Sequence, residues 1–277
     1  MKVSTTITAS ARTLLSRWER ALLVLPALAG LGLGLILVFL PGYFAAVTQF
    51  PADDAYIYQL AGAAILGYGV ALSFSVFQRD WLAVRLVVIG VLINNLASLY
   101  ACGMAIATGN APYSVYLFLA TNLLFVAICG VLIALHWGVP RPEANFASRA
   151  MQFFLIVGTL AAGAFGVFPL FVPNLFTLFH LHINAPFIIR EAGAASLGYA
   201  VVAVLAQRAL TRQELPLITV MGAIFNGVGG LVSIPYLLAG GILLLPWVIA
   251  PVGLIVLVVC LLVLRQIRAR TEKMSKS

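Results

Sequence analysis

Long apolar runs separated by short connections dominate the pattern of hydrophobic and polar positions along this chain. A helix needs about 20 consecutive apolar residues to cross the hydrocarbon layer of a bilayer. Eight runs have about this length, and they cover residues 21–41, 56–78, 82–107, 113–137, 152–172, 186–207, 216–239 and 242–264. The pattern therefore predicts an all-α, polytopic membrane protein with eight transmembrane helices.

The composition agrees with a lipid environment. Hydrophobic residues make up 63% of the chain and charged residues only 9%, whereas soluble domains carry about 25% charged residues. The first apolar run is longer than the roughly 7–15 residues of a signal-peptide core, so we expect it to stay as a helix. The three cysteines, Cys102, Cys129 and Cys260, lie inside apolar runs without disulfide or zinc-ligand spacing, which predicts buried free thiols.

The positive charges are distributed unevenly between the two sides of the predicted bundle. If all eight runs span, every Lys and Arg except Arg190 falls on one side. Cytoplasmic loops are enriched in these residues. We therefore expect both termini in the cytoplasm, in a bacterial-type cell (inner) membrane, with basic residues beside anionic headgroups. The net charge of +8 does not indicate a nucleic-acid partner, because no basic cluster has interleaved aromatic residues.

Two segments repeat one another at an offset of 131 residues. Residues 59–68 (QLAGAAILGY) and 190–199 (REAGAASLGY) agree at seven of ten positions, and the same offset relates Asn95 to Asn226. Because four spans is an even number, both copies have the same orientation. The sequence thus predicts two parallel four-helix repeats related by a pseudo-two-fold axis along the membrane normal.

The predicted domain organisation follows from this repeat. A cytoplasmic or interfacial amphipathic segment covers residues 1–20, repeat 1 covers 21–140, repeat 2 covers 150–268 and a cytoplasmic tail covers 269–277. Within the first segment, residues 8–20 have an apolar and a basic face, which fits either a short surface helix or a plain basic tail.

The repeated segments also predict closely packed helices, because small residues let helix backbones approach one another in lipid. Glycines lining a pathway are the functional alternative. The tyrosine hydroxyls need partners at that depth, and intramembrane asparagines usually bond across helices. The helix-packing candidates are Gly62, Gly67, Gly193, Gly198, Tyr68, Tyr199, Asn95 and Asn226.

The two halves differ most at the outer end of the second helix in each repeat. Gln59 and Leu60 stand there in the first half, and Arg190 and Glu191 in the second. Ionisable residues at membrane depth are candidates for function. The predicted outer-face cluster, offered as a ligand-binding hypothesis, consists of Arg190, Glu191, His180, His182, Asp53, Asp54 and Gln59.

Three interpretations of this cluster remain open. It is structural if Arg190 snorkels to the surface and the other groups are solvated. It is a binding site for a lipid headgroup, quinone or small anion if Arg190 is a cationic anchor. It is a metal or proton-transfer site if His180 and His182 point to one side of an extended segment and Glu191 completes the ligands. No catalytic residue and no particular cofactor follows from the sequence, and His136 is expected at the inner interface.

Residues 187–200 (FIIREAGAASLGYA) and, less fully, residues 59–69 resemble the small bacterial four-helix membrane proteins grouped around DoxX. The shared features are a polar residue that opens the second helix, an Ala-Gly pair and a Leu-Gly-Tyr segment. The resemblance implies a four-helix module present twice. It also implies an accessory role beside quinone-linked redox reactions, as for some members of that group.

Three functions are consistent with these features. The first is a non-catalytic module that binds a lipid, a quinone or a subunit of a membrane complex. The second is a small-solute transporter or channel at the interface between the repeats. The third is an intramembrane enzyme or metal site on the outer face. Charges lie mainly in the outer half, with only Asn and Tyr at mid-depth, which weighs against a continuous pathway and favours the first function.

Overall fold

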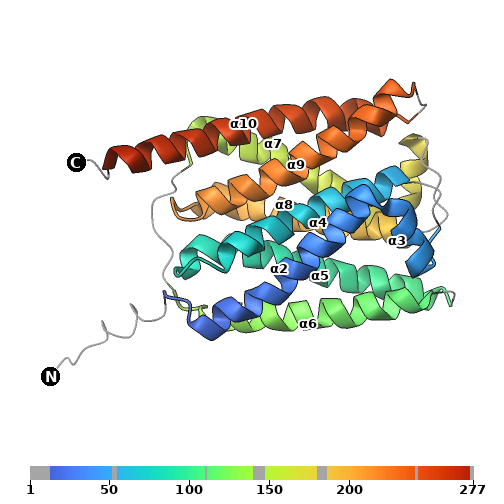
Figure 1. Cartoon of the computed structure of the whole chain (residues 1–277), viewed down its shortest axis with the longest axis horizontal. Coiled ribbons are helices and arrows are strands. Elements are labelled where there is room, and N and C mark those ends of the chain that lie inside the picture. Colours follow the sequence, from blue (N-terminus) through green and yellow to red (C-terminus); the bar gives the residue numbers. More distant parts are fainter. Residues whose placement is uncertain are drawn as a thin grey trace.

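Eight long helices form one up-and-down bundle in the computed structural model, which describes residues 13–51, 55–109, 111–139, 147–179, 186–240 and 243–274. They are α2 (Arg17–Phe39), α4 (Ala55–Ser75), α5 (Trp81–Ala107), α6 (Tyr113–Leu135), α7 (Arg149–Phe171), α8 (Pro186–Ala209), α9 (Leu215–Leu238) and α10 (Leu245–Met274). All eight are long and apolar enough to cross a membrane, so the chain is a multi-pass membrane protein. The start of α2 and the end of α10 lie at the same end of the bundle (Figure 1).

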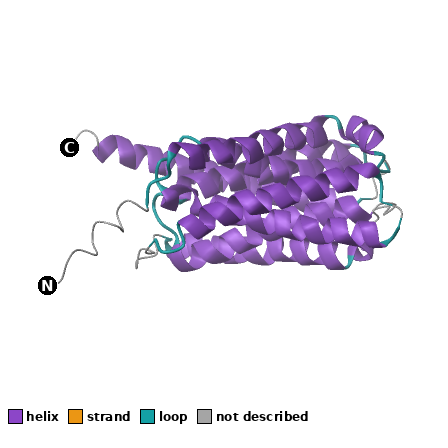
Figure 2. Ribbon diagram, turned by 90° about the horizontal axis from the view of Figure 1, so that it is seen from below, coloured by secondary structure: helices purple, strands orange, loops and turns teal. Residues whose placement is uncertain are grey.

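Two short helices that the hydrophobic pattern does not indicate follow the first long helix of each half. They are α3 (Pro41–Thr48) and the 3₁₀ helix η1 (Pro173–Phe179). Each begins at a proline, which is tolerated in a first turn because its missing N–H has no intrahelical partner there. Phe44 and Phe176 are buried on these elements. Figure 2 shows the helices joined by short loops at the two ends of the bundle.

Most predicted spans agree with the observed helices to within about three residues, and two ends differ more. The first helix begins at Arg17 because Ser16 and Glu19 form a capping box that starts it early. The last helix continues to Met274, so the polar tail predicted after residue 268 is helical over most of its length.

The surface helix expected over residues 8–20 is wrong in its described part. Residues 13–16 are not helical, and the Leu15 N–H donates to the Arg79 carbonyl at 2.7 Å. Residues 17–20 instead form the first turn of α2. This short stretch is therefore tied to the loop between α4 and α5.

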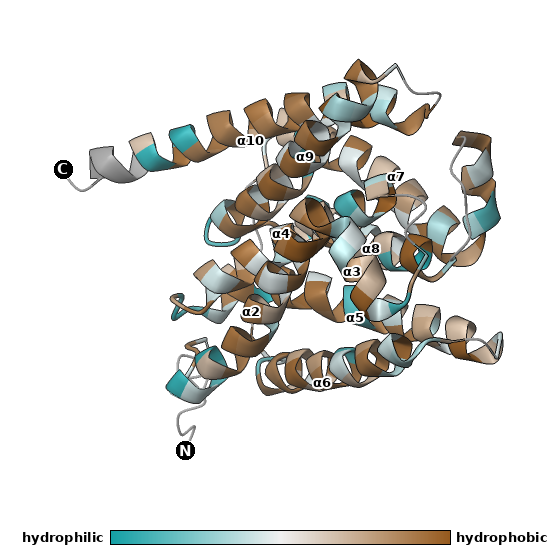
Figure 3. Ribbon diagram, turned by 45° about the vertical axis from the view of Figure 1, so that its right-hand side comes forward, coloured by the Kyte–Doolittle hydropathy of each residue, from teal (hydrophilic) through white to brown (hydrophobic). Residues whose placement is uncertain are grey.

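The helices of the two halves interlock. α4 packs against α2 of its own half and α9 of the other, while α8 packs against α7 of its own half and α5 of the other. The most buried helices are α4, α5 and α8, whereas α6, α7 and α10 expose most of their surface. Figure 3 shows hydrophobic residues along most of each helix, as lipid contact requires.

At the crossing of α4 and α8, two tyrosines make reciprocal hydrogen bonds. The Tyr68 hydroxyl donates to the Ala195 carbonyl at 2.9 Å, and the Tyr199 hydroxyl donates to the Ala64 carbonyl at 2.9 Å. Their ring centroids are 4.5 Å apart. The two acceptors, like the two donors, are 131 residues apart. Both hydroxyls are thus satisfied inside the protein, where no water is at hand.

Glycines make this crossing possible. A Cβ on Gly198 would collide with the Tyr68 hydroxyl and would lie 2.5 Å from the Gly90 carbonyl oxygen. A Cβ on Gly67 would collide with the Tyr199 hydroxyl. The two helices therefore approach closely because neither glycine carries a side chain.

A second pair of glycines lies between neighbouring helices. A Cβ on Gly62 would lie 2.9 Å from the Val38 nitrogen on α2, and a Cβ on Gly193 would lie 2.8 Å from the Leu170 nitrogen on α7. Val38 and Leu170 are 132 residues apart. The α2–α4 and α7–α8 contacts are thus built in the same way.

The two intramembrane asparagines bond within their own helices, whereas their depth predicts bonds between helices. The Asn95 amide donates to the Val91 carbonyl at 2.7 Å, and the Asn226 amide donates to the Gly222 carbonyl at 2.9 Å. A carbonyl one turn earlier is within easy reach of such a side chain, so it satisfies the amide locally.

Gly198→Ala is expected to destabilise the bundle, because the added methyl group meets the Tyr68 hydroxyl at a crossing without free space. Overpacking of this kind costs about 1–3 kcal/mol. Gly163→Ala is the matched control, since nothing outside its own helix lies within 4 Å of that Cβ position. Thermal unfolding in mild detergent, followed by circular dichroism, should show a lower midpoint only for Gly198→Ala. Equal midpoints for the two variants would contradict this packing.

Candidate functional site

Glu191 lies in the second turn of α8, facing α5. Its side chain is 8% exposed, and its Oε2 accepts a hydrogen bond from the Ser98 hydroxyl at 2.7 Å. Its Oε1 is buried and has no hydrogen-bond partner among the described residues. A buried polar group left unpaired costs about 1–3 kcal/mol, and more if it is charged. The carboxyl group therefore lies where it weakens the fold unless something else binds it.

Other polar side chains gather around this carboxyl group. Cys102 follows Ser98 by one turn on α5 and lies within electrostatic range of Glu191. The Asn122 amide of α6 donates a weak hydrogen bond to the Cys102 sulfur at 3.9 Å. All four side chains are buried. We call Ser98, Cys102, Asn122 and Glu191 the Glu191 cluster.

Arg190 precedes Glu191 but points in a different direction, because successive helical residues are about 100° apart. Its side chain is half-buried, and its Nε is buried without a partner among the described residues. Two neighbouring residues of α8 thus each carry an unpaired polar atom. One is a donor and the other belongs to a carboxyl group.

Polar groups at the corresponding end of α4 are satisfied. The Gln59 amide nitrogen donates to the Val38 carbonyl at 3.1 Å, and its oxygen accepts from the Tyr236 hydroxyl at 3.0 Å. Tyr56 and Ser233 join their hydroxyls at 2.8 Å. Gln59 therefore bonds to α2 and α9 and does not belong to the Glu191 cluster.

The residue after Gln59 shows what the fold accepts at this place. Leu60 faces Gly229 of α9, and its Cδ2 would lie 3.9 Å from a Cβ there. At the offset of 131, Leu60 corresponds to Glu191 and Gly229 to Ser98. One half thus has an apolar contact where the other has a carboxyl–hydroxyl pair.

Four of the predicted site residues lie outside the described residues, and they are Asp53, Asp54, His180 and His182. Their approach to α8 stays a prediction. In the part of the chain that the structure describes, no three His, Cys, Asp or Glu side chains are close enough to hold a metal ion.

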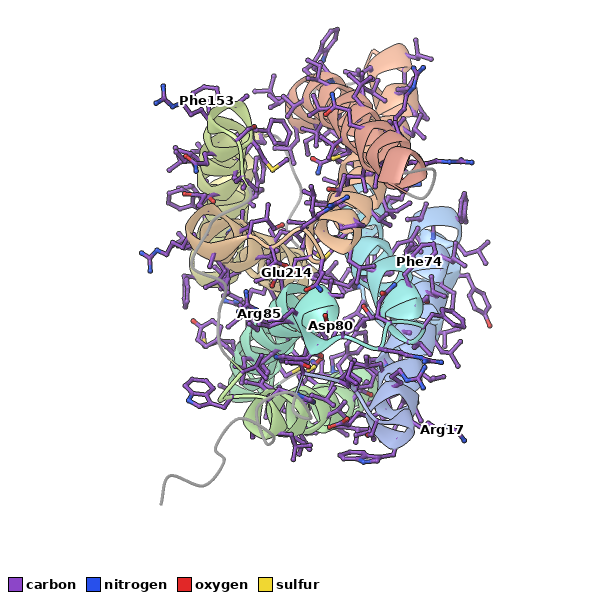
Figure 4. All side chains as sticks on the ribbon, turned by 90° about the vertical axis from the view of Figure 1, so that its left-hand side faces the viewer. Arg17, Phe74, Asp80, Arg85, Phe153 and Glu214 are labelled. Atoms are coloured by element: carbon purple, nitrogen blue, oxygen red, sulfur yellow. The ribbon has the colours of Figure 1, made fainter. Side chains whose placement is uncertain are left out.

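A buried ion pair that the sequence does not reveal lies at the basic end of the bundle. We use this name for the end where α2 begins and α10 ends, which holds every described arginine except Arg190. Arg85 Nη2 of α5 lies 2.8 Å from Glu214 Oε1 at the start of α9, and both side chains are near the centre of this end (Figure 4). Charges are thus present in the inner half, which the sequence predicts to be almost free of them.

Glu214 is held from two sides. The Thr211 N–H donates to its Oε2 at 2.8 Å, and the Thr211 hydroxyl accepts from its N–H at 3.1 Å. Burial raises the pKa of the Glu214 carboxyl, while Arg85 and Thr211 act in the opposite direction. Removing one partner of such a pair costs about 3–5 kcal/mol. The pair therefore fastens α5 to α9, and the Thr-x-x-Glu pattern before an apolar run is the available sequence signal.

A second polar contact at the basic end joins α2 to α6. His136 Nε2 lies 3.1 Å from Glu19 Oε1, and the Trp81 ring stacks on the imidazole with centroids 4.8 Å apart. His136 is only 5% exposed. The histidine is therefore buried in the bundle and is not the interfacial residue that its place in the sequence predicts.

No protein-family model matches this chain, and neither a curated protein nor a solved structure matches it. Its function is therefore inferred from its own residues.

Proposed function

We propose that the protein is a non-catalytic membrane module that binds a lipophilic molecule, a quinone or a lipid, through a polar head group held by Glu191. The observation that carries this proposal is the buried Oε1 atom without a described partner. Ionisable groups at membrane depth are costly and usually functional. A ligand that hydrogen-bonds to this oxygen would remove much of the cost.

The other half of the bundle supports this interpretation. Leu60 and Gly229 occupy the corresponding place without any polar group. The packing of these helices therefore does not require a carboxyl group at Glu191. A residue that the fold does not need, and that weakens it, fits a role in binding.

The chemistry of the Glu191 cluster suits an oxygen-rich head group. Ser98 holds one carboxyl oxygen and leaves the other open. As a carboxylate, Glu191 accepts from a quinol or lipid hydroxyl, and in its protonated form it donates to a quinone carbonyl. Arg190 Nε is a second donor on the same turn. One turn earlier, Phe187 stacks on Phe50 at 5.0 Å, which provides an apolar neighbour for a ring or chain.

A transport pathway between the halves is less well supported. Tyr68 and Tyr199 close the centre of the α4–α8 crossing and direct their hydroxyls to backbone carbonyls. Nearer the basic end, Arg85 and Glu214 neutralise one another. The polar groups along this interface are thus paired internally, whereas a solute needs open ones.

We also propose that the halves, residues 21–140 and 150–268, are parallel repeats of a DoxX-like four-helix module related by a pseudo-two-fold axis. The reciprocal tyrosine bonds and the matching glycine contacts support the repeat. The gathering of arginines at the basic end supports the placement of both termini in the cytoplasm of a bacterial-type inner membrane. A partner subunit in a membrane complex remains part of this proposal.

The orientation predicts a labelling pattern in spheroplasts. Thr108→Cys, at the exposed end of α5, should react with a membrane-impermeant maleimide, and Gln213→Cys, exposed at the basic end, should react only after permeabilisation. The native cysteines are buried, so the unmodified protein is the control for background. The opposite pattern would reverse the orientation, and labelling of both positions before permeabilisation would contradict the eight-span topology.

Glu191→Leu tests the binding proposal, because it reproduces the apolar residue of the other half and should leave the fold intact. The protein is purified in mild detergent, and bound quinone and lipid are measured by native mass spectrometry and by the absorption change of quinones on reduction. Loss of a hydrogen bond to a charged group, about 1.5–3 kcal/mol, should lower retention at least tenfold.

Gln59→Leu is the matched control, since it removes a polar group at a similar depth from a side chain that bonds to α2 and α9. It should retain the ligand. Equal retention by Glu191→Leu and the unmodified protein, or the absence of any bound quinone or lipid from the unmodified protein, would overturn the proposal.

A further inference from the structure

A cleft of about 200 Å³ opens at the basic end between α7 and α10. Its inner lining is apolar and consists of Met151 on α7, Leu215 at the start of α9, and Val263 and Ile267 on α10. Figure 4 looks onto this end and shows α7, which carries the label Phe153, standing apart from α10. The cleft thus lies between two helices that pack on other partners.

The rim of the cleft is polar and carries a positive charge. Ser148, Arg212 and Gln266 line it, and all three are exposed. The segments that form the cleft carry four further exposed arginines, which are Arg149, Arg208, Arg265 and Arg268. The described acidic residue of these segments, Glu214, is already paired with Arg85. The surroundings of the cleft therefore favour an anion.

The corresponding place in the first half is filled. There Glu19 of α2 meets His136 of α6 at 3.1 Å, and Trp81 stacks on the imidazole. These three side chains close the space between the first and fourth long helices of that half.

In the second half, the same three places hold different residues. At the offset of 132, Glu19 corresponds to Met151; at 131, His136 corresponds to Ile267 and Trp81 to Arg212. Methionine and isoleucine cannot form the polar bridge, and arginine replaces the stacked indole with a flexible cation. With the repeat alignment proposed above, the cleft exists because the second half lacks the side chains that fill it in the first.

We propose that this cleft binds the head-group region of an anionic phospholipid. The lipid phosphate accepts hydrogen bonds from the Arg212 guanidinium and the Gln266 amide at the rim. The glycerol and first acyl carbons contact the apolar lining. The acyl chains then follow the exposed apolar faces of α7 and α10, which include Phe153 and Leu262. Basic pockets between membrane helices are suited to such head groups.

This site is separate from the Glu191 cluster. Along α8, Glu191 and the end of the helix at Ala209 are about 27 Å apart at 1.5 Å per residue. Glu191→Leu should therefore leave phospholipid binding at the cleft unchanged. Failure of one proposal can thus be told from failure of the other.

The test uses the full chain in mild detergent, titrated with short-chain phosphatidylglycerol or phosphatidylcholine and followed by native mass spectrometry and thermal unfolding. Phosphatidylglycerol should bind and raise the midpoint, and phosphatidylcholine should bind at least tenfold more weakly. Arg212→Gln should lower the affinity for phosphatidylglycerol at least tenfold. Arg17→Gln is the matched control, because this exposed arginine lies at the basic end on α2, far from the cleft (Figure 4).

Ile267→Trp provides an independent variant, since it fills the cleft without changing its charge and should also remove binding. Equal binding of the two lipids, or equal affinities of Arg212→Gln and Arg17→Gln, would overturn the proposal. An equal rise in the midpoint with inorganic phosphate alone would overturn the part played by the acyl chains.

Discussion

Inside the hydrocarbon of a membrane, a polar group must find its partner within the protein, because water is not available there. The bundle follows this constraint through its centre, where Tyr68 and Tyr199 donate to backbone carbonyls of the facing helix. Buried side-chain atoms without a partner in the described part belong to three residues, which are Arg20, Arg190 and Glu191. Arg20 lies at the basic end, near headgroups and water, which leaves the α8 pair as the exception at membrane depth.

The two halves share a framework and differ at opposite ends of it. At the end away from the termini, the second half has Glu191 and Ser98 where the first has an apolar contact. At the basic end the relation is reversed, since the first half has the Glu19–His136 bridge and the second has an apolar cleft. Each difference exchanges a satisfied contact for an open one. We therefore place both proposed ligands in the second half.

The eight spans could be predicted because each is marked by an apolar run long enough to cross a bilayer. Local contacts decided where the prediction failed: the Ser16–Glu19 capping box starts α2 early, and α3 is too short to have a periodic signal. Glu191 could be recognised from its depth, but Ser98 could not be named as its partner from 93 positions away. Arg85 and Glu214 lie 129 positions apart and look like ordinary loop charges, so only the fold joins them.

The central claim is that a molecule from outside the chain completes the Glu191 carboxyl. An electron cryomicroscopy map of the protein in lipid nanodiscs tests it directly, because it also shows the segments on either side of α8. The account predicts density for a bound amphiphile with a polar atom about 3 Å from Glu191 Oε1. An imidazole of His180 or His182, or any other group of the protein, in that position would contradict it.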